Sequence, residues 1–177
     1  MDVEVRLAAF DDAAEITRVH IAAWRDAYRA ILPTAHLDRL DESTLTTRRE
    51  NTLRASGSAT FVAERDGRIV GYCVAGPNRG PPPNINGELQ AIYLLPGHQG
   101  TGLGRLLTRV AAEWILVHLG EAMIVWTFEQ NAPARGFYQH LGGRLAGYRL
   151  LNIDGAGAFP VVAYRWEDVR TLLASST

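Results

Sequence analysis

The sequence predicts a single α/β domain, residues 1–177, in which a mixed sheet of six or seven strands is flanked by about four helices. Two observations predict this class. Segments with strand periodicity and segments with helix periodicity alternate along the chain, without a linker or internal repeat that would mark a second domain. Hydrophobic residues make up 47% and charged residues 21% of the 177 residues, which is ordinary for a protein with one buried core.

The first third of the chain predicts one strand followed by helices. Apolar and charged residues alternate over residues 3–7, which indicates a short strand. Asp12 and Glu15 have the spacing of a capping box, and apolar residues then recur at helical spacing to about Ala30. Residues 34–55 are polar and favour helix, with an internal break.

The middle of the chain predicts a hairpin and a third strand. Residues 60–64 and 68–75 are apolar and β-prone, and Asp66-Gly67 between them suits a tight turn. Residues 76–87 contain four prolines and three glycines, so we expect a loop there, long enough to suspect a role in substrate binding. Residues 88–95 follow as a buried strand that ends at a proline.

The last third alternates helix and strand. Apolar residues mark one face of a helix at residues 103–118, and residues 122–128 form an apolar strand. A short helix is expected at residues 131–141, with an asparagine cap at its start and a glycine after its end. Two strands, at about residues 144–152 and 160–166, complete the order.

Composition excludes several classes of partner. The net charge is −1 and the arginines are scattered, so we expect no nucleic-acid partner. The chain lacks both a signal-peptide pattern and an apolar stretch of membrane-spanning length, so we expect a cytoplasmic protein with no membrane partner. Cys73 is the single cysteine and is expected to be a buried structural thiol. The histidines show no metal-ligand spacing on one helix, so we expect no metal.

A glycine-rich loop joins the strand at residues 88–95 to the helix at residues 103–118. It reads Pro96-Gly97-His98-Gln99-Gly100-Thr101-Gly102-Leu103-Gly104. The start of a helix carries unpaired N–H groups and partial positive charge, and glycines let a phosphate or pyrophosphate approach them. A plain connecting turn is the alternative, but three alternating glycines would add unfolded-state entropy without a gain.

Two common nucleotide motifs do not fit this loop. The dinucleotide pattern G-x-G-x-x-G fails, because a start at Gly100 ends on Arg105 and a start at Gly102 ends on Leu107. The pattern G-x-x-x-x-G-K-[ST] fails as well, because the chain has no Gly-Lys pair.

The loop instead resembles the Q/R-x-x-G-x-G/A motif of the GNAT superfamily of acetyl-CoA-dependent N-acyltransferases. Gln99, Gly102 and Gly104 occupy its fixed positions, and the preceding strand ends in a proline as in the family. A second motif of the family, N-x-x-A-x-x-F-Y, is matched from Asn131 to Tyr138. The two motifs cover roughly residues 60–143 in the family's order, and the earlier residues fit in layout only.

The resemblance implies the acyl-CoA N-acyltransferase fold, with a mostly antiparallel sheet in which two parallel strands splay apart. These would be the strands at residues 88–95 and 122–128, with acetyl-CoA between them as acyl donor. The implied donor-binding residues are Ile92, Tyr93 and Leu94 for the pantetheine arm, the amides of Gln99, Gly100, Thr101, Gly102, Leu103, Gly104 and Arg105 for the pyrophosphate, and Asn131 and Phe137 nearby.

The same resemblance implies catalytic roles. Tyr138 matches the family tyrosine near the CoA sulfur, where it would protonate the leaving thiolate, although a solvent-facing helix tyrosine is the alternative. Glu88 is the candidate general base, directly or through water, with Glu129 as its rival. Strand alternation would place Glu88 on the same face as Ile92 and Leu94, unless a bulge resets the parity.

The acceptor side is less defined. Trp24 and Tyr28 share a helix face, because they lie four residues apart, and they match the family's acceptor-lining helices, although core packing is the alternative. A small-molecule or peptide amine is the expected acceptor, and a homodimer is common in the family. The expected activity is direct transfer of acetyl to a primary amine in a ternary complex. A catalytically silent acyl-CoA-binding module is the alternative function.

Overall fold

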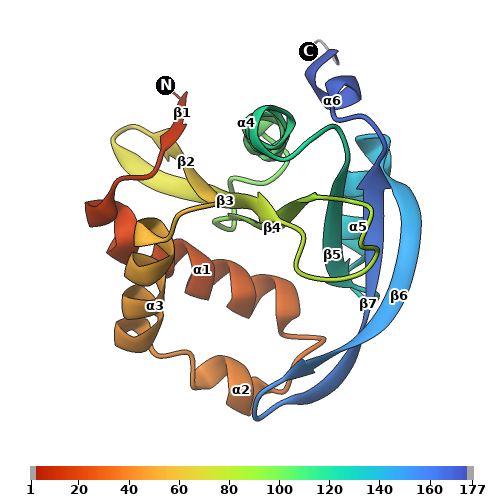
Figure 1. Ribbon diagram of the computed structural model, residues 1–177. Coiled ribbons are helices and arrows are strands. Elements are labelled where there is room, and N and C mark those ends of the chain that lie inside the picture. The colour runs from red at the N-terminus through yellow and green to blue at the C-terminus, as the bar shows by residue number, and fades with distance from the viewer. Residues whose placement is uncertain (1–2, 175–177) are drawn as a thin grey trace.

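The computed structural model describes residues 3–174, which form one seven-stranded sheet in the order β1-β2-β3-β4-β5-β7-β6. Neighbouring strands are antiparallel except for β4 and β5, which are parallel. Figure 1 shows α4 on one side of the sheet and α1, α2 and α3 on the other. The predicted fold class, with its mixed sheet and single parallel pair, is confirmed.

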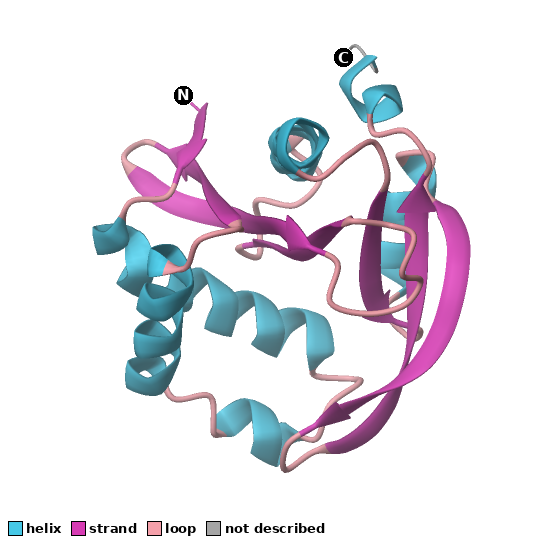
Figure 2. Cartoon of the chain, viewed as in Figure 1, coloured by secondary structure: helices cyan, strands magenta, loops and turns pink. Residues whose placement is uncertain are grey.

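The helices and strands lie close to the predicted segments (Figure 2). The strands are β1 Val3–Leu7, β2 Ala59–Arg65, β3 Arg68–Pro77, β4 Gly87–Leu94, β5 Met123–Phe128, β6 Arg144–Ile153 and β7 Gly157–Trp166. The helices are η1 Phe10–Asp12, α1 Ala13–Tyr28, α2 Thr34–Asp38, α3 Glu42–Arg54, α4 Leu103–His118, α5 Ala132–His140 and α6 Arg170–Ala174. Two short helices, η1 and α6, were not predicted.

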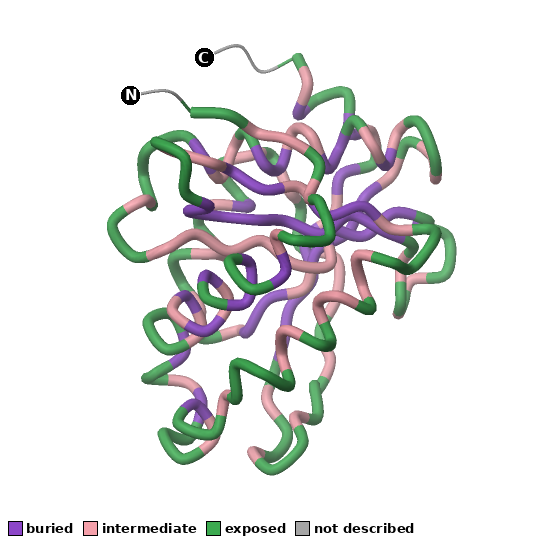
Figure 3. The backbone as a smooth tube through the Cα atoms, turned by 90° about the vertical axis from the view of Figure 1, so that its left-hand side faces the viewer, coloured by how far each residue is buried: buried purple, intermediate pink, exposed green. Residues whose placement is uncertain are grey.

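Each face of the sheet carries its own core. On the α4 face, Leu103, Leu107 and Ile115 are spaced so that they meet the strands from one side of the helix, and all are at most 1% exposed. On the opposite face, Ile16 and Val19 of α1 pack with side chains of β2 and β3. Figure 3 shows the buried backbone running along the central strands between these two layers.

The capping box predicted at Asp12 and Glu15 is wrong. The Asp12 carboxylate accepts the N–H of Ala9 at 2.7 Å and pairs with Arg6, also at 2.7 Å. Glu15 accepts the N–H of Ile69 on β3 at 3.0 Å. Both carboxylates therefore connect the start of α1 to neighbouring segments. They accept hydrogen bonds from groups outside the helix in place of the N–H groups of its first turn.

A bulge in β4 changes which side chains share a face. The register with β3 shifts between Leu89 and Ala91, so Gln90 is left without a partner and alternation restarts after it. Leu89, Ile92 and Leu94 pack in the α4-side core. Glu88 therefore does not share their face, since its neighbour Leu89 points to the α4 side, and the bulge is the exception under which the expected alternation does not hold.

The parallel pair β4 and β5 separates soon after it begins. The two strands are in register at Gly87–Met123 and Glu88–Ile124, and these are the pairs found within residues 3–174. A Cβ at Gly87 would collide with Ile115 and lie 3.1 Å from the Ala122 carbonyl oxygen, so glycine allows the strands to meet there. Beyond Glu88, β4 pairs with β3 and β5 pairs with β7, which leaves two strand edges facing a gap.

Candidate active site

The loop between β4 and α4 depends on glycine for its backbone path. Gly97, Gly100 and Gly102 have φ values of +86°, +72° and +86°, in the left-handed region that other residues rarely adopt. A Cβ at any of the three would meet nothing within 4 Å. Backbone conformation, and not crowding inside the protein, is therefore what requires glycine, and the outer side of the loop is open to a ligand.

The amides at the start of α4 have no partner in the helix. The first helical bond runs from the N–H of Leu106 to the carbonyl of Gly102, so the N–H groups of Leu103, Gly104 and Arg105 precede the ladder. Gly102 has no side chain to cap them, and the first turn holds no acidic residue. This leaves a cluster of unsatisfied N–H donors beside partial positive charge, which suits an anion.

Phe137 of α5 closes one side of this loop. A Cβ on Gly104 would lie 3.2 Å from Phe137 Cζ, so glycine at this position lets the aromatic ring pack on the start of α4. Asn131 caps α5, because its Oδ1 accepts the N–H of Ala134 at 3.2 Å. This packing brings the second motif, Asn131 to Tyr138, next to the glycine loop at the gap between β4 and β5. The two motifs are far apart in the chain.

Tyr138 is buried at the same place, with 5% of its surface exposed. Its ring packs near Tyr164 and Trp166, with centroids 5.9 and 6.3 Å away. Burial, and then the negative charge that Tyr93 would carry, raises the pKa of the Tyr138 phenol. The phenol therefore stays protonated at neutral pH, and Tyr93 of β4 and Tyr138 of α5 interact electrostatically.

The Glu88 carboxylate is 3% exposed and fully engaged by Arg79. Arg79 donates its backbone N–H to Oε2 at 2.8 Å and its Nη2 to Oε1 at 2.7 Å. These contacts tie the loop at residues 78–86 to the start of β4. Both carboxylate oxygens of Glu88 are therefore occupied by Arg79.

The rival carboxylate, Glu129, follows β5. The Arg135 guanidinium donates to the carbonyl of Glu129 at 3.0 Å and to the Tyr164 hydroxyl at 3.2 Å, so it points away from the glycine loop. Arg105 lies 3.2 Å from His140 Nε2 through its Nη2 atom.

An aromatic cluster covers the opposite face of β4. His20, Trp24 and Tyr28, which are four residues apart on α1, surround Tyr93, with ring centroids 5.4, 6.4 and 6.4 Å from it. The Tyr28 and Tyr93 hydroxyls lie 3.2 Å apart, and Tyr28 is buried. This cluster connects the α1 side of the protein to the gap where Tyr138 lies.

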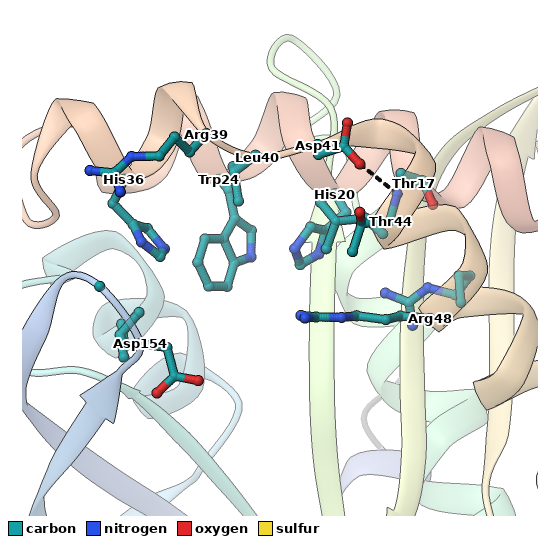
Figure 4. Close-up of a pocket in the computed structure, with 14 residues that line it drawn as sticks. Thr17, His20, Trp24, His36, Arg39, Leu40, Asp41, Thr44, Arg48 and Asp154 are labelled. Carbon is teal, nitrogen blue, oxygen red and sulfur yellow. Dashed lines mark hydrogen bonds between the residues drawn. The ribbon is translucent and has the colours of Figure 1, made fainter.

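A cavity of about 640 Å³ opens beside this cluster, between α1, the α2–α3 segment and the β6–β7 turn. Figure 4 shows His20, Trp24 and Arg48 directed into it, with Asp154 across from Arg48. Trp24 lines the cavity, whereas Tyr28 packs behind it against Phe128 at 4.8 Å. The loop at residues 76–87, suspected from its length, contributes no lining residue among those described.

His20 was not predicted as a site residue. Burial, helped by the charge of Arg49, lowers the pKa of His20 to about 4, so its imidazole is neutral at physiological pH. Its Nδ1 lies 2.7 Å from the Tyr72 hydroxyl, which also accepts from Arg49 at 3.1 Å. The spacing of His20, four residues before Trp24, is the sequence signal that could have found it.

Metal and membrane features were searched in the described part of the chain. Residues 3–174 contain no group of three or more His, Cys, Asp or Glu side chains placed to hold a metal ion. None of the helices in this range has the length and apolar character needed to cross a membrane.

Comparison with known proteins gives the family. Residues 21–143, more than half of the chain, match the family model described as "Acetyltransferase (GNAT) family". The chain belongs to the GNAT acetyltransferase family. It is accordingly an acyltransferase enzyme, an N-acetyltransferase of the GNAT type, and the expectation drawn from the two motifs is confirmed at this level.

Individual relatives of this GNAT acetyltransferase agree with the family match. An uncharacterized N-acetyltransferase of Bacillus subtilis is 37% identical over 138 residues, covering 77% of this chain and 78% of the relative. A probable N-acetyltransferase of Mycobacterium tuberculosis is 29% identical over 171 residues, covering 93% of each.

Solved structures share the fold of this GNAT acetyltransferase. A ribosomal-protein-alanine N-acetyltransferase of Brucella melitensis superposes with a TM-score of 0.72 at 22% identity, over 92% of this chain and 98% of the other. An N-acetyltransferase of Thermoplasma acidophilum in complex with coenzyme A gives 0.67 at 16% identity, over 94% and 100%.

Proposed function

We propose that this enzyme transfers the acetyl group of acetyl-CoA directly to a primary amine, with both substrates bound at once. The observation that carries the proposal is the set of free N–H groups at the start of α4, next to the gap between β4 and β5. A pyrophosphate can accept hydrogen bonds from the N–H groups, and an extended chain with amide groups can pair with a strand edge in the gap.

The residues present fit acetyl-CoA. The loop amides would hold the pyrophosphate, the free edge of β4 would pair with the pantetheine arm, and Phe137 would pack beside it. The residues assigned to the donor are Ile92, Tyr93, Leu94, Gln99, Gly100, Thr101, Gly102, Leu103, Gly104, Arg105, Asn131 and Phe137. When bound, the donor supplies an acyl group activated as a thioester.

The two-sided arrangement supports direct transfer. The glycine loop leads into α4 on one face of the sheet, and the cavity beside Trp24 lies on the other face. Donor and acceptor can thus approach the gap from opposite faces without competing. Burial raises the pKa of the Cys73 thiol, so the single cysteine stays protonated and is a poor acyl carrier.

Tyr138 is assigned the role of general acid. Transfer forms a bond from the amine nitrogen to the acetyl carbon and breaks the bond from that carbon to sulfur, so the departing thiolate needs a proton. The raised pKa of Tyr138 keeps its phenol protonated and available for this purpose, and its burial beside the gap keeps bulk water away.

Glu88 is assigned the role of general base, acting through water. The amine must lose a proton before or during attack, and the Glu88 carboxylate lies at the point where β4 and β5 separate. Because Arg79 occupies both carboxylate oxygens, a water molecule would carry the proton. Glu129 and bulk water are the rival acceptors.

The deciding experiment is a panel of amines incubated with acetyl-CoA while free CoA thiol is detected. We expect thiol release and acetylated amine in equal amounts for at least one class of primary amine. Thiol release no faster than hydrolysis with every amine, from a protein that still binds acetyl-CoA, would favour the silent binding module.

A further inference from the structure

The acceptor cavity is rich in unneutralised positive charge. Three arginines line it, Arg39, Arg48 and Arg49, against two acids, Asp41 and Asp154. Within residues 3–174, none of the three arginines takes part in a salt bridge. Five other arginines, among them Arg6 and Arg79, are paired with carboxylates. The three cavity arginines are therefore without a carboxylate partner inside the described part of the protein.

The individual arginines have donors to spare. Arg49 gives one Nη2 hydrogen bond to Tyr72 and lies 4.7 Å above the Tyr72 ring, while its buried Nε has no partner. Arg39 uses its Nε on the carbonyl of Ala35. The Arg48 side chain makes no hydrogen bond to another described residue and points into the cavity (Figure 4). A buried donor without an acceptor is costly, and an oxyanion would satisfy it.

The acids and histidine do not cancel this charge. Asp41 is occupied as the cap of α3, where its carboxylate accepts the Thr44 N–H at 2.7 Å. Asp154 stands on the β6–β7 turn, across the cavity from Arg48 (Figure 4). His20 is neutral at physiological pH, because burial lowers its pKa to about 4. With three arginines against two carboxylates, the cavity lining carries a net positive charge.

We propose that the acceptor amine carries an anionic group, a carboxylate or a phosphate, which binds to Arg48 and Arg49. This inference rests on the proposed function and names its substrate class. Arginine presents paired N–H donors that match these oxyanions. Trp24 and His20 then cover the carbon skeleton of the acceptor, and its amine points past Tyr93 towards the gap. A cavity of about 640 Å³ has the size of a small-molecule site.

The test uses pairs of amines that differ in the anionic group alone. One pair is 4-aminobutanoate and 4-aminobutanamide, and the other is 2-aminoethyl phosphate and ethanolamine. We expect the anionic member of at least one pair to have a kcat/KM about tenfold higher or more, and the two pairs separate carboxylate from phosphate recognition. Equal or better use of the neutral members in both pairs would overturn the inference while leaving the acetyltransferase proposal intact.

Variants assign the effect to the arginines. Arg48→Met should reduce the preference for the anionic amine to about a tenth of its wild-type value, and Arg48→Lys should restore part of it. The matched control is Arg68→Met, an exposed arginine at the β2–β3 turn, which should keep the wild-type preference.

Two other outcomes are informative. An increase in the KM for acetyl-CoA in Arg48→Met, with an unchanged amine preference, would assign the arginine to the donor and overturn the inference. Absence of turnover with every amine would contradict the proposed function itself and the inference with it. Unfolding temperature in the presence of CoA checks that the variants remain folded.

Discussion

Tyr138 is a phenol whose surroundings suit a proton donor better than a solvent-facing helix position would. It is buried among aromatic rings, and among residues 3–174 its hydroxyl forms no hydrogen bond. The hydroxyl therefore has its hydrogen-bonding capacity free for a substrate. The environment therefore supports the acid role that the second motif indicated.

Replacing Tyr138 by Phe should lower kcat by about 100-fold or more, because the leaving thiolate loses its proton donor while the ring packing survives. The KM for acetyl-CoA should change little. Steady-state kinetics against the control Tyr148→Phe, whose side chain is 65% exposed on β6, would measure the effect. A kcat within about twofold of wild type would assign the proton to water instead.

Sequence reasoning at this scale found residues within motifs and missed their partners. Tyr138 and Glu88 were proposed from the resemblance of their segments to the family. Arg79, which binds Glu88, lies in a Pro/Gly-rich loop whose path across the end of β4 depends on tertiary contacts. Arg49 contributes to the site through Tyr72, a contact between segments 23 residues apart. Such pairings are set by the fold and leave no periodic signal in the chain.

The loop before α4 is the element on which donor binding depends. It contains three glycines in the left-handed region, and α4 starts without a capping side chain, so that its first N–H groups have no partner in the helix. A simple turn of the same length could use ordinary residues. The loop therefore sacrifices local stability for an open cluster of donors.

Gly102→Ala should raise the KM for acetyl-CoA about tenfold, because a Cβ strains the left-handed backbone that orients the amides. The matched control is Gly67→Ala at the β2–β3 turn, where φ is +75° and a Cβ also meets nothing within 4 Å. Both variants should lose about 1–2 kcal/mol of stability, measured by urea unfolding. Equal KM values for the two variants would contradict a role of the loop in donor binding.

Element boundaries were predicted closely where periodicity was strong. The helix at residues 103–118 is found with the same bounds, because its apolar stripe is continuous. The bulge in β4 was not predictable, since hydrophobic alternation does not show where one residue is left unpaired. Of the last two strands, β6 ends one residue later than predicted, and β7 begins three residues earlier, at Gly157.

At the scale of the whole molecule, the sheet separates two half-sites. The loop and α4 occupy one face, and the aromatic cluster and cavity occupy the other. The gap between β4 and β5 is where they meet. Binding of the donor should consequently connect β4 and β5 where these two strands do not pair with each other.

Acetyl-CoA at about 100 times its dissociation constant should stabilise the folded state by about 2.7 kcal/mol, which raises the unfolding temperature by about 5–10 °C. Acetyl-pantetheine at the same concentration should give a smaller shift, because it lacks the pyrophosphate. Differential scanning fluorimetry measures both. An equal shift with both compounds would argue against the loop as the phosphate site.

The short pairing of β4 with β5 also affects how the donor range of the enzyme can evolve. The two halves of the sheet come from contiguous stretches of chain, residues 3–94 and 123–166, and are joined at Gly87–Met123 and Glu88–Ile124. Beyond these pairs, no register pairing joins β4 to β5 within residues 3–174, and side chains such as Phe137 pack nearby against the start of α4. Substitutions there can alter the room for a longer acyl chain while every strand keeps its partners, so donor range can evolve separately from the fold.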